Sequence, residues 1–229
     1  VTDSGTLVIP GTATISASGQ AVTLDESSNN FGTLVVTGAN VAVIDTNAII
    51  LGASTISGTY DVTTGGAITA SGALVITGET TLAAGSSNDI TLDHASNDFQ
   101  GGLIITSGNN VTLVDTGAII LGASTVSGTY TVTAGGAITD SGTQEIAGVT
   151  TIEAGSGNDI TLNTPANNFA AAVVVTSGNN VTLVDEDAIA LGASTVSGTY
   201  TLTAAGAVTD TGALAITGVT TIAAGSGNN

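Results

Sequence analysis

The chain has no lysine, no arginine and no cysteine among its 229 residues, and it also lacks methionine and tryptophan. Without lysine or arginine it cannot contact phosphate groups through cationic side chains, so no nucleic-acid partner is expected. A polybasic attachment to a membrane surface is excluded on the same ground. Without cysteine there can be no disulfides, so the fold must be stabilised by packing and backbone hydrogen bonds.

Charge is scarce and almost entirely negative. The chain has 18 aspartate and glutamate residues and one histidine, for a formal charge of −18, while 42% of its residues are hydrophobic. That hydrophobic fraction is too high for a solvated disordered tail. No apolar run is long enough to span a bilayer, so direct membrane insertion is not expected. Valine, isoleucine and threonine are abundant, and these residue types favour β-strands.

An internal repeat is the main feature of the sequence. The segment LGASTISGTY begins at Leu51, and LGASTVSGTY begins at Leu121 and Leu191, which gives a period of 70 residues. We place the repeat units at residues 1–40, 41–108, 109–178 and 179–229. Because the first and last units are incomplete, we expect the caps of the fold and any secretion signal to lie outside this sequence.

Within each repeat, short alternating segments are separated by Gly, Asn, Ser and Asp. In residues 111–114, Val111 and Leu113 fall on one face of a strand, and Thr112 and Val114 fall on the other. No segment carries a helical periodicity. The pattern predicts an all-β fold, a right-handed parallel β-helix with about three coils per repeat, continuous over residues 1–229. The recurring Phe and Tyr residues are expected to pack in its core.

Several segments of the repeat resemble a known family. The segments GNDITL, NNF, GNNVTL and LGASTVSGTYTVTAGGAITDSG are similar to repeat regions of filamentous-haemagglutinin-like bacterial surface proteins. The resemblance covers essentially the whole chain. It implies secretion to the cell surface, often by a two-partner route, and a role in adhesion, biofilm or an extracellular fibre.

Catalytic residue patterns are sparse, so we do not expect an enzyme. His94 is the sole histidine, and Glu26 and Thr164 occupy its place in other repeats, so a Ser/His/Asp site is unsupported. The acidic trio 185–187 occurs in one repeat only. A pair of carboxyl groups ~5–10 Å apart could still cleave a glycosidic bond. Binding or cleavage of polysaccharides is therefore the alternative function, and surface glycans are possible partners.

Aspartate recurs at fixed places in the repeat and could bind calcium, which prefers carboxylate and carbonyl oxygens. No EF-hand loop or glycine-rich calcium-binding nonapeptide is present, and solvated turn residues are the competing interpretation. The candidate ligands are Asp45, Asp115, Asp185, Asp140, Asp210, Asp89 and Asp159.

Apolar residues at the outward parity of the strands form a candidate assembly surface. They are expected to line up as a strip along the rod, and such strips mark interaction surfaces. A threonine-rich face could instead bind ice, but the triplet at 129, 131 and 133 falls in one coil in three. The sequence favours an extracellular structural rod, fibre or adhesin shaft that associates with copies of itself. The proposed assembly residues are Ile44, Val114, Val184, Ile50 and Ile120.

Overall fold

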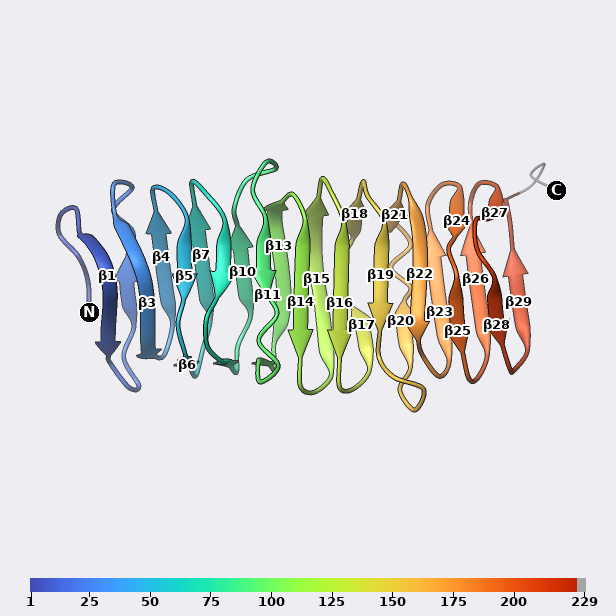
Figure 1. The fold of residues 1–229 in the computed structure, drawn as a ribbon, viewed down its shortest axis with the longest axis horizontal. Helices are drawn as coiled ribbons and strands as arrows, with labels where there is room; N and C mark the ends of the chain where they lie inside the picture. The colour runs from blue at the N-terminus through green and yellow to red at the C-terminus, as the bar shows by residue number, and fades with distance from the viewer. Residues whose placement is uncertain (226–229) are drawn as a thin grey trace.

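A computed structural model describes residues 1–225 as a parallel β-solenoid of about 11 turns, with no helix among them (Figure 1). Two long sheets run along the rod, and their arrows point in opposite directions across the view in Figure 1. The chain therefore passes along one side of the rod, turns, and returns along the other side in each coil. The parallel β-helix expected from the sequence is confirmed.

The first long sheet, sheet A, contains 13 strands. They are β2 (Val22–Leu24), β4 (Val41–Asp45), β7 (Tyr60–Thr64), β10 (Thr80–Ala83), β13 (Gly102–Gly108), β15 (Ile119–Val126), β17 (Ile138–Asp140), β18 (Gln144–Ile146), β20 (Ile160–Leu162), β21 (Asn168–Phe169), β23 (Val181–Asp185), β26 (Tyr200–Ala204) and β29 (Thr220–Ala223).

The second long sheet, sheet B, contains 14 strands, and two further strands pair only with each other. Sheet B comprises β1 (Val8–Ser16), β3 (Asn30–Gly38), β5 (Ile49–Leu51), β6 (Ser54–Ile56), β8 (Ile68–Ala70), β9 (Leu74–Ile76), β11 (Ile90–Leu92), β12 (Asp98–Phe99), β14 (Val111–Asp115), β16 (Tyr130–Ala134), β19 (Thr150–Glu153), β22 (Ala172–Ser177), β24 (Ile189–Leu191) and β27 (Val208–Asp210). The separate pair is β25 (Ser194–Val196) and β28 (Leu214–Ile216).

The pairing register shows that one repeat spans three and a half coils, which refines the expected number of about three. Along sheet A, the successive pairings are 41–60, 60–80, 80–103, 103–121, 119–138, 138–160 and 160–181. These seven steps connect Val41 to Val181, which are 181 − 41 = 140 residues, or two repeats, apart. Equivalent residues of successive repeats therefore lie on opposite sides of the rod. Accordingly, β4 and β23 lie in sheet A, whereas the equivalent strand β14 lies in sheet B.

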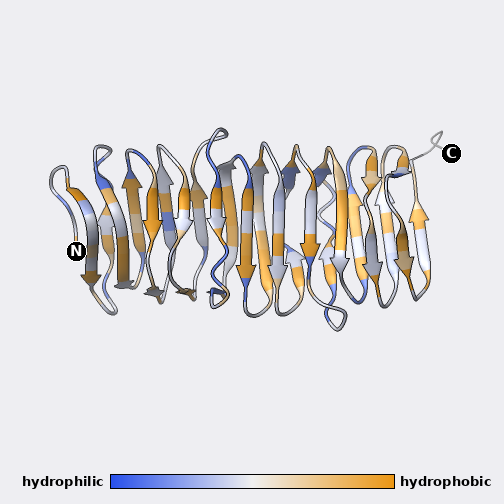
Figure 2. Ribbon diagram, viewed as in Figure 1, coloured by the Kyte–Doolittle hydropathy of each residue, from blue (hydrophilic) through white to orange (hydrophobic). Residues whose placement is uncertain are grey.

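The core is a column of alternate side chains between the two sheets. Val111, Leu113 and their counterparts are buried, whereas Thr112 and Val114 are partly exposed, as the alternation predicts. Hydrophobic and polar colours alternate along the strands in Figure 2. The largest fully buried side chains are the tyrosines and phenylalanines that recur once per repeat, which confirms their expected role in packing. They are Tyr60, Tyr130, Tyr200, Phe31, Phe99 and Phe169.

Glycines stack at equivalent corners on the two sides of the rod, because neighbouring coils leave no room there for a side chain. A Cβ atom on Gly78 would lie 2.5 Å from the carbonyl carbon and oxygen of Gly58 in the preceding coil. A Cβ atom on Gly101 would lie 2.2 Å from the carbonyl oxygen of Gly78. The same contact recurs between Gly148 and Gly128, one repeat later and on the opposite side. These corners therefore depend on glycine for the close approach of successive coils.

Candidate functional site

The aspartates at the ends of three equivalent strands are buried inside the corner of the coil. Asp45, Asp115 and Asp185 are 1%, 3% and 2% exposed, respectively. In Asp115, Oδ2 accepts a hydrogen bond from the backbone N–H of Phe99 at 2.6 Å, and Oδ1 accepts one from Gly117 at 2.7 Å. Asp45 and Asp185 make the equivalent pairs of bonds. These contacts explain the recurrence of aspartate without a metal ion.

Burial sets the protonation behaviour of two of these aspartates. Desolvation raises the pKa of Asp115 and of Asp185 above the ordinary value for aspartate. The backbone N–H groups that bind each carboxylate oppose this shift, because they favour the charged form. The nearby acidic residue Asp98 further raises the pKa of Asp115. Each of these carboxylates is therefore buried at a cost in desolvation free energy, and its hydrogen bonds hold the turn to the strand end.

A buried asparagine beside each phenylalanine forms a second polar column, which the sequence analysis missed. Asn167 is 0% exposed, and its Oδ1 accepts a hydrogen bond from the N–H of Gln144 at 2.9 Å. Its Nδ2 donates to Oδ2 of Asp140 at 2.6 Å. Asn29 and Asn97 are equally buried. The signal was present in the sequence as the recurring motif Asn-x-Phe.

The other predicted calcium ligands take part in hydrogen bonds between coils or lie exposed at strand ends. Asp140 accepts bonds from the N–H groups of Asn163 and Thr164. Asp210 is exposed at the end of β27. Within residues 1–225, no three acidic or histidine side chains are grouped so that they could hold a metal ion. The assignment of these aspartates as calcium ligands stays a prediction.

Asp89 and Asp159 lie exposed in equivalent turns one repeat apart. Oδ1 of Asp159 accepts three hydrogen bonds of 3.0 Å, from Nδ2 of Asn179 and from the backbone and side-chain nitrogens of Asn180. The backbone N–H of Asn180 is the main cause of the lowered pKa of Asp159. Asp89 makes the same three bonds with the asparagines of its own repeat. Both aspartates therefore link neighbouring turns at the surface of the rod.

The proposed assembly residues all point outward, but they do not form one strip. Ile50 and Ile120 are 41% and 38% exposed, and Ile44, Val114 and Val184 are partly exposed. Because each repeat spans a half-integral number of coils, Ile44, Ile120 and Val184 lie on sheet A, whereas Ile50 and Val114 lie on sheet B. The expected single strip is therefore divided between two opposite faces.

The triplet at 129, 131 and 133 does not continue into the neighbouring coils, as expected, because Val114 and Glu153 pair with Thr133. Its middle residue, however, belongs to a longer row of single threonines. On sheet B, one threonine from each of five successive coils lies in register with the next. These residues are Thr69, Thr91, Thr112, Thr131 and Thr151. They project outward, since the residues on either side of Thr91 and Thr112 are buried. The row cannot be seen in the residues of one coil, because each coil contributes a single threonine to it. It becomes visible only when single residues are aligned between coils.

Neither candidate catalytic group is arranged for catalysis. Asp185 is buried, whereas its neighbours Glu186 and Asp187 are exposed, so the trio does not converge on one site. Nδ1 of His94 accepts a hydrogen bond from the N–H of Ser96 at 3.2 Å within its own turn.

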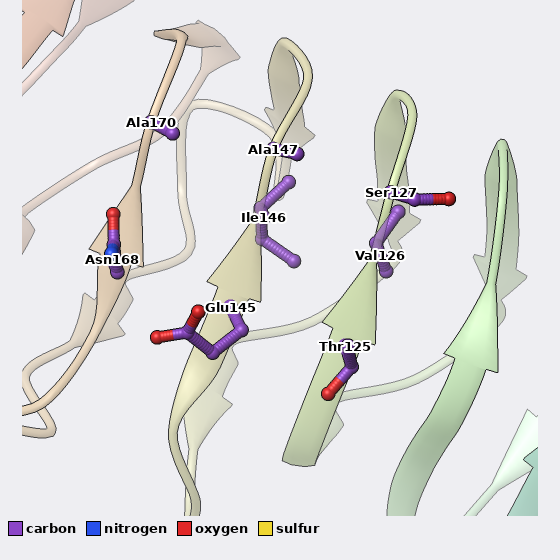
Figure 3. A pocket seen from close by; sticks show the side chains of 8 residues that line it. All are labelled: Thr125, Val126, Ser127, Glu145, Ile146, Ala147, Asn168 and Ala170. Atoms are coloured by element: carbon purple, nitrogen blue, oxygen red, sulfur yellow. The ribbon is translucent and has the colours of Figure 1, made fainter. Parts of the chain in front are cut away.

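A shallow pocket lies over β15, β18 and β21 on sheet A (Figure 3). Its volume is about 280 Å³, and Glu145 is the one titratable residue that lines it. The small side chains of Ala147 and Ala170 leave it open, whereas Thr77 and Gln100 occupy the equivalent places one repeat earlier. A glycosidase needs two carboxyl groups flanking the bond, and this pocket offers one.

The family comparison assigns the chain to a group of repeats. The model of the family described as "Repeats of unknown function (DUF5649)" matches residues 1–38, 38–106, 108–176 and 178–229, so the chain belongs to this family. No curated protein and no solved structure matches the chain. No helix suited to crossing a membrane occurs in the part of the chain that the structure describes.

Proposed function

We propose that the chain is a segment of an extracellular structural rod, which serves as a fibre subunit or adhesin shaft at a cell surface. The observation that carries this proposal is the use of its polar residues. Polar residues that recur in the repeat and resemble ligand sets instead form hydrogen bonds that hold the corners and successive coils together. They include Asp115, Asn167 and Asp140. This use of the polar residues favours a long, regular rod, which is the form expected of a structural protein.

The extracellular location rests on composition and on the resemblance to filamentous-haemagglutinin-like repeats. With no lysine or arginine, the chain offers trypsin-like proteases no cleavage site. The formal charge of −18 also keeps separate rods apart at low ionic strength.

Calcium would act between rods in this proposal. Exposed carboxylates at the turns, such as Asp89 and Asp159, have no cationic side chain to pair with. In each of them Oδ2 accepts no hydrogen bond within residues 1–225. Divalent cations that bridge such oxygens would relieve repulsion between neighbouring rods.

Electron microscopy of the purified chain with calcium, and then with a chelator, tests this function. Bundles or fibres that disperse on chelation are expected. The double variant Asp89→Asn/Asp159→Asn should lose the calcium effect, whereas Asp61→Asn/Glu153→Gln, with the same change in charge away from those turns, should retain it. Isolated rods under both conditions would refute calcium bridging and leave a passive stalk.

Binding of a polysaccharide remains the second candidate, favoured by the pocket beside Glu145. Retention of the chain on a neutral polysaccharide column, abolished by Ala147→Thr or Ala170→Gln, would support it. Both substitutions introduce the residues that occupy these places in the preceding repeat.

A further inference from the structure

Each broad face of the rod carries a row of uncharged β-branched side chains that are in register from coil to coil. On sheet B the row runs from Ile50 through the five threonines already named to Val174. On sheet A the corresponding row is Ile120, Thr139, Thr161, Thr182, Thr201 and Thr221. We call these the sheet B row and the sheet A row.

The two rows are the same sequence feature displayed twice. Each member of the sheet A row lies 70 residues after a member of the sheet B row, as Ile120 follows Ile50 and Thr182 follows Thr112. The repeat of three and a half coils places the second copy on the opposite side of the rod. Any partner that fits one face therefore finds an equivalent face on the opposite side of the rod, displaced along its axis by three and a half coils.

The rows are large enough for a weak contact between two rods. The sheet B row crosses seven strands and the sheet A row six, so at a strand spacing of ~4.8 Å each is roughly 30 Å long, and the five-residue strands among them give a width of roughly 17 Å. The resulting area of about 500 Å² per row is smaller than the ~800 Å² that each partner buries in a stable protein complex, so the contact should form in a concentration-dependent way.

Charge also favours contact through these faces rather than through the turns. Neither row contains an ionisable residue. Exposed carboxylates such as Asp93, Asp159 and Glu186 lie in turns, although Asp61, Glu145 and Glu153 project from strands. Among the threonine hydroxyls of the two rows, only that of Thr69 donates a hydrogen bond within residues 1–225. The others are free to bond to a partner.

We propose that a second copy of this chain docks face to face on these rows, and that the duplication of the face makes this association open-ended. A contact that uses one face leaves the equivalent opposite face free, so the assembly grows as a stack instead of closing as a dimer. This inference specifies the partner in the proposed structural role and therefore rests on it. Because both copies are acidic, stacking should strengthen as salt shortens the Debye length to ~8 Å at 0.15 M.

Charged substitutions on one face or on both faces test the proposal. Sedimentation velocity at increasing protein concentration should show a broad series of stacks for the unmodified chain. Thr112→Glu blocks the sheet B face and Thr182→Glu blocks the sheet A face, so either variant alone should stop at dimers. The double variant should be monomeric. Far-UV circular dichroism verifies folding, and Thr131→Glu replaces Thr112→Glu if that variant does not fold.

The control is Ser87→Glu, which adds the same charge at an exposed turn and should leave the stacks intact. A monomeric wild-type chain at all salt concentrations would overturn the stacking proposal and leave a rod that acts as a stalk. Filaments that persist in the double variant would overturn it differently, because they would indicate end-to-end growth and leave a fibre-forming role in place. A monomeric chain that adsorbs to ice or to a neutral polysaccharide would assign the rows to that ligand instead.

Discussion

Gly148→Ala should be one of the most damaging small substitutions in the chain. The new Cβ atom would lie 2.3 Å from the carbonyl oxygen and 2.5 Å from the carbonyl carbon of Gly128, and 2.9 Å from the nitrogen of Thr129. All three are backbone atoms of the adjacent coil, so no rotamer change can relieve the clash. We expect a loss of about 3 kcal/mol in the free energy of unfolding, the upper end for overpacking.

Gly157→Ala is the matched control. No heavy atom lies within 4 Å of its Cβ position, and its φ is not in the left-handed region. Alanine should therefore stabilise the chain by about 0.5 kcal/mol, because it restricts the unfolded state. Urea unfolding followed by tyrosine fluorescence and circular dichroism measures both effects. Equal midpoints for the two variants would refute the close approach of the coils at this corner. Gly78→Ala, on the opposite side of the rod, should reproduce the loss.

Four further predictions concern the buried polar groups. Asp115→Ala leaves the N–H groups of Phe99 and Gly117 unsatisfied, so urea unfolding should show a loss of about 3 kcal/mol; no loss would mean that water replaces the carboxylate. Asn167→Ala should cost about 2 kcal/mol in the same assay, since it removes the partner of Gln144. Tyr60→Phe should raise stability by about 1 kcal/mol, because the buried Oη has no hydrogen-bond partner, and a decrease would reveal a bound water. Thermal unfolding should occur at a higher temperature at pH 4 than at pH 7, with a smaller difference in Asp115→Asn/Asp185→Asn; a lower temperature at pH 4 would contradict the raised pKa values.

The sign of the pH effect follows from the direction of the pKa shifts. Burial raises the pKa of Asp115 and Asp185 in the folded chain above that of the unfolded chain. Their contribution to stability is therefore largest below the unfolded pKa of ~3.9 and is lost as the pH rises through the folded value. The exposed Asp159 acts in the opposite direction, because its pKa is lowered in the folded chain and its contribution is lost as the pH falls. The variant Asp115→Asn/Asp185→Asn therefore separates the effect of the buried aspartates from that of Asp159.

Strand alternation was sufficient to predict much of the fold. Val111 and Leu113 are buried and Val114 points outward, as their parity requires. The same parity also places Asp115 on the buried side, because it lies two residues after Leu113. We expected Asp115 to be a calcium ligand or a solvated turn residue, because aspartate is usually exposed. The alternation in the sequence therefore indicated that Asp115 is buried, but we gave more weight to the usual exposure of aspartate.

The division of the repeat into half-coils could not be obtained from the 70-residue period. Successive coils along sheet A contain different numbers of residues, from 18 between Leu103 and Leu121 to 23 between Thr80 and Leu103. The difference arises in turns and in irregularities within strands, such as the register shifts between β10 and β13 and between β13 and β15. Only the pairing shows that equivalent residues alternate between sides, and this alternation decides whether a recurring residue forms a continuous row or two separate rows.

The placement of the recurring residues also limits which surfaces could bind a partner. The polar columns that recur most strictly in the sequence are directed into corners and between coils, where Asp115 and Asn167 satisfy backbone groups. The strict recurrence of these polar residues in the chain therefore reflects the hydrogen bonds that successive coils need, and it does not identify a binding site. A partner can be recognised only by what remains outside, which is the turns with their carboxylates and the two uncharged faces. Substitutions at Thr112 and at Thr182 change equivalent faces on opposite sides, so comparing them tells whether the molecule uses one face or both.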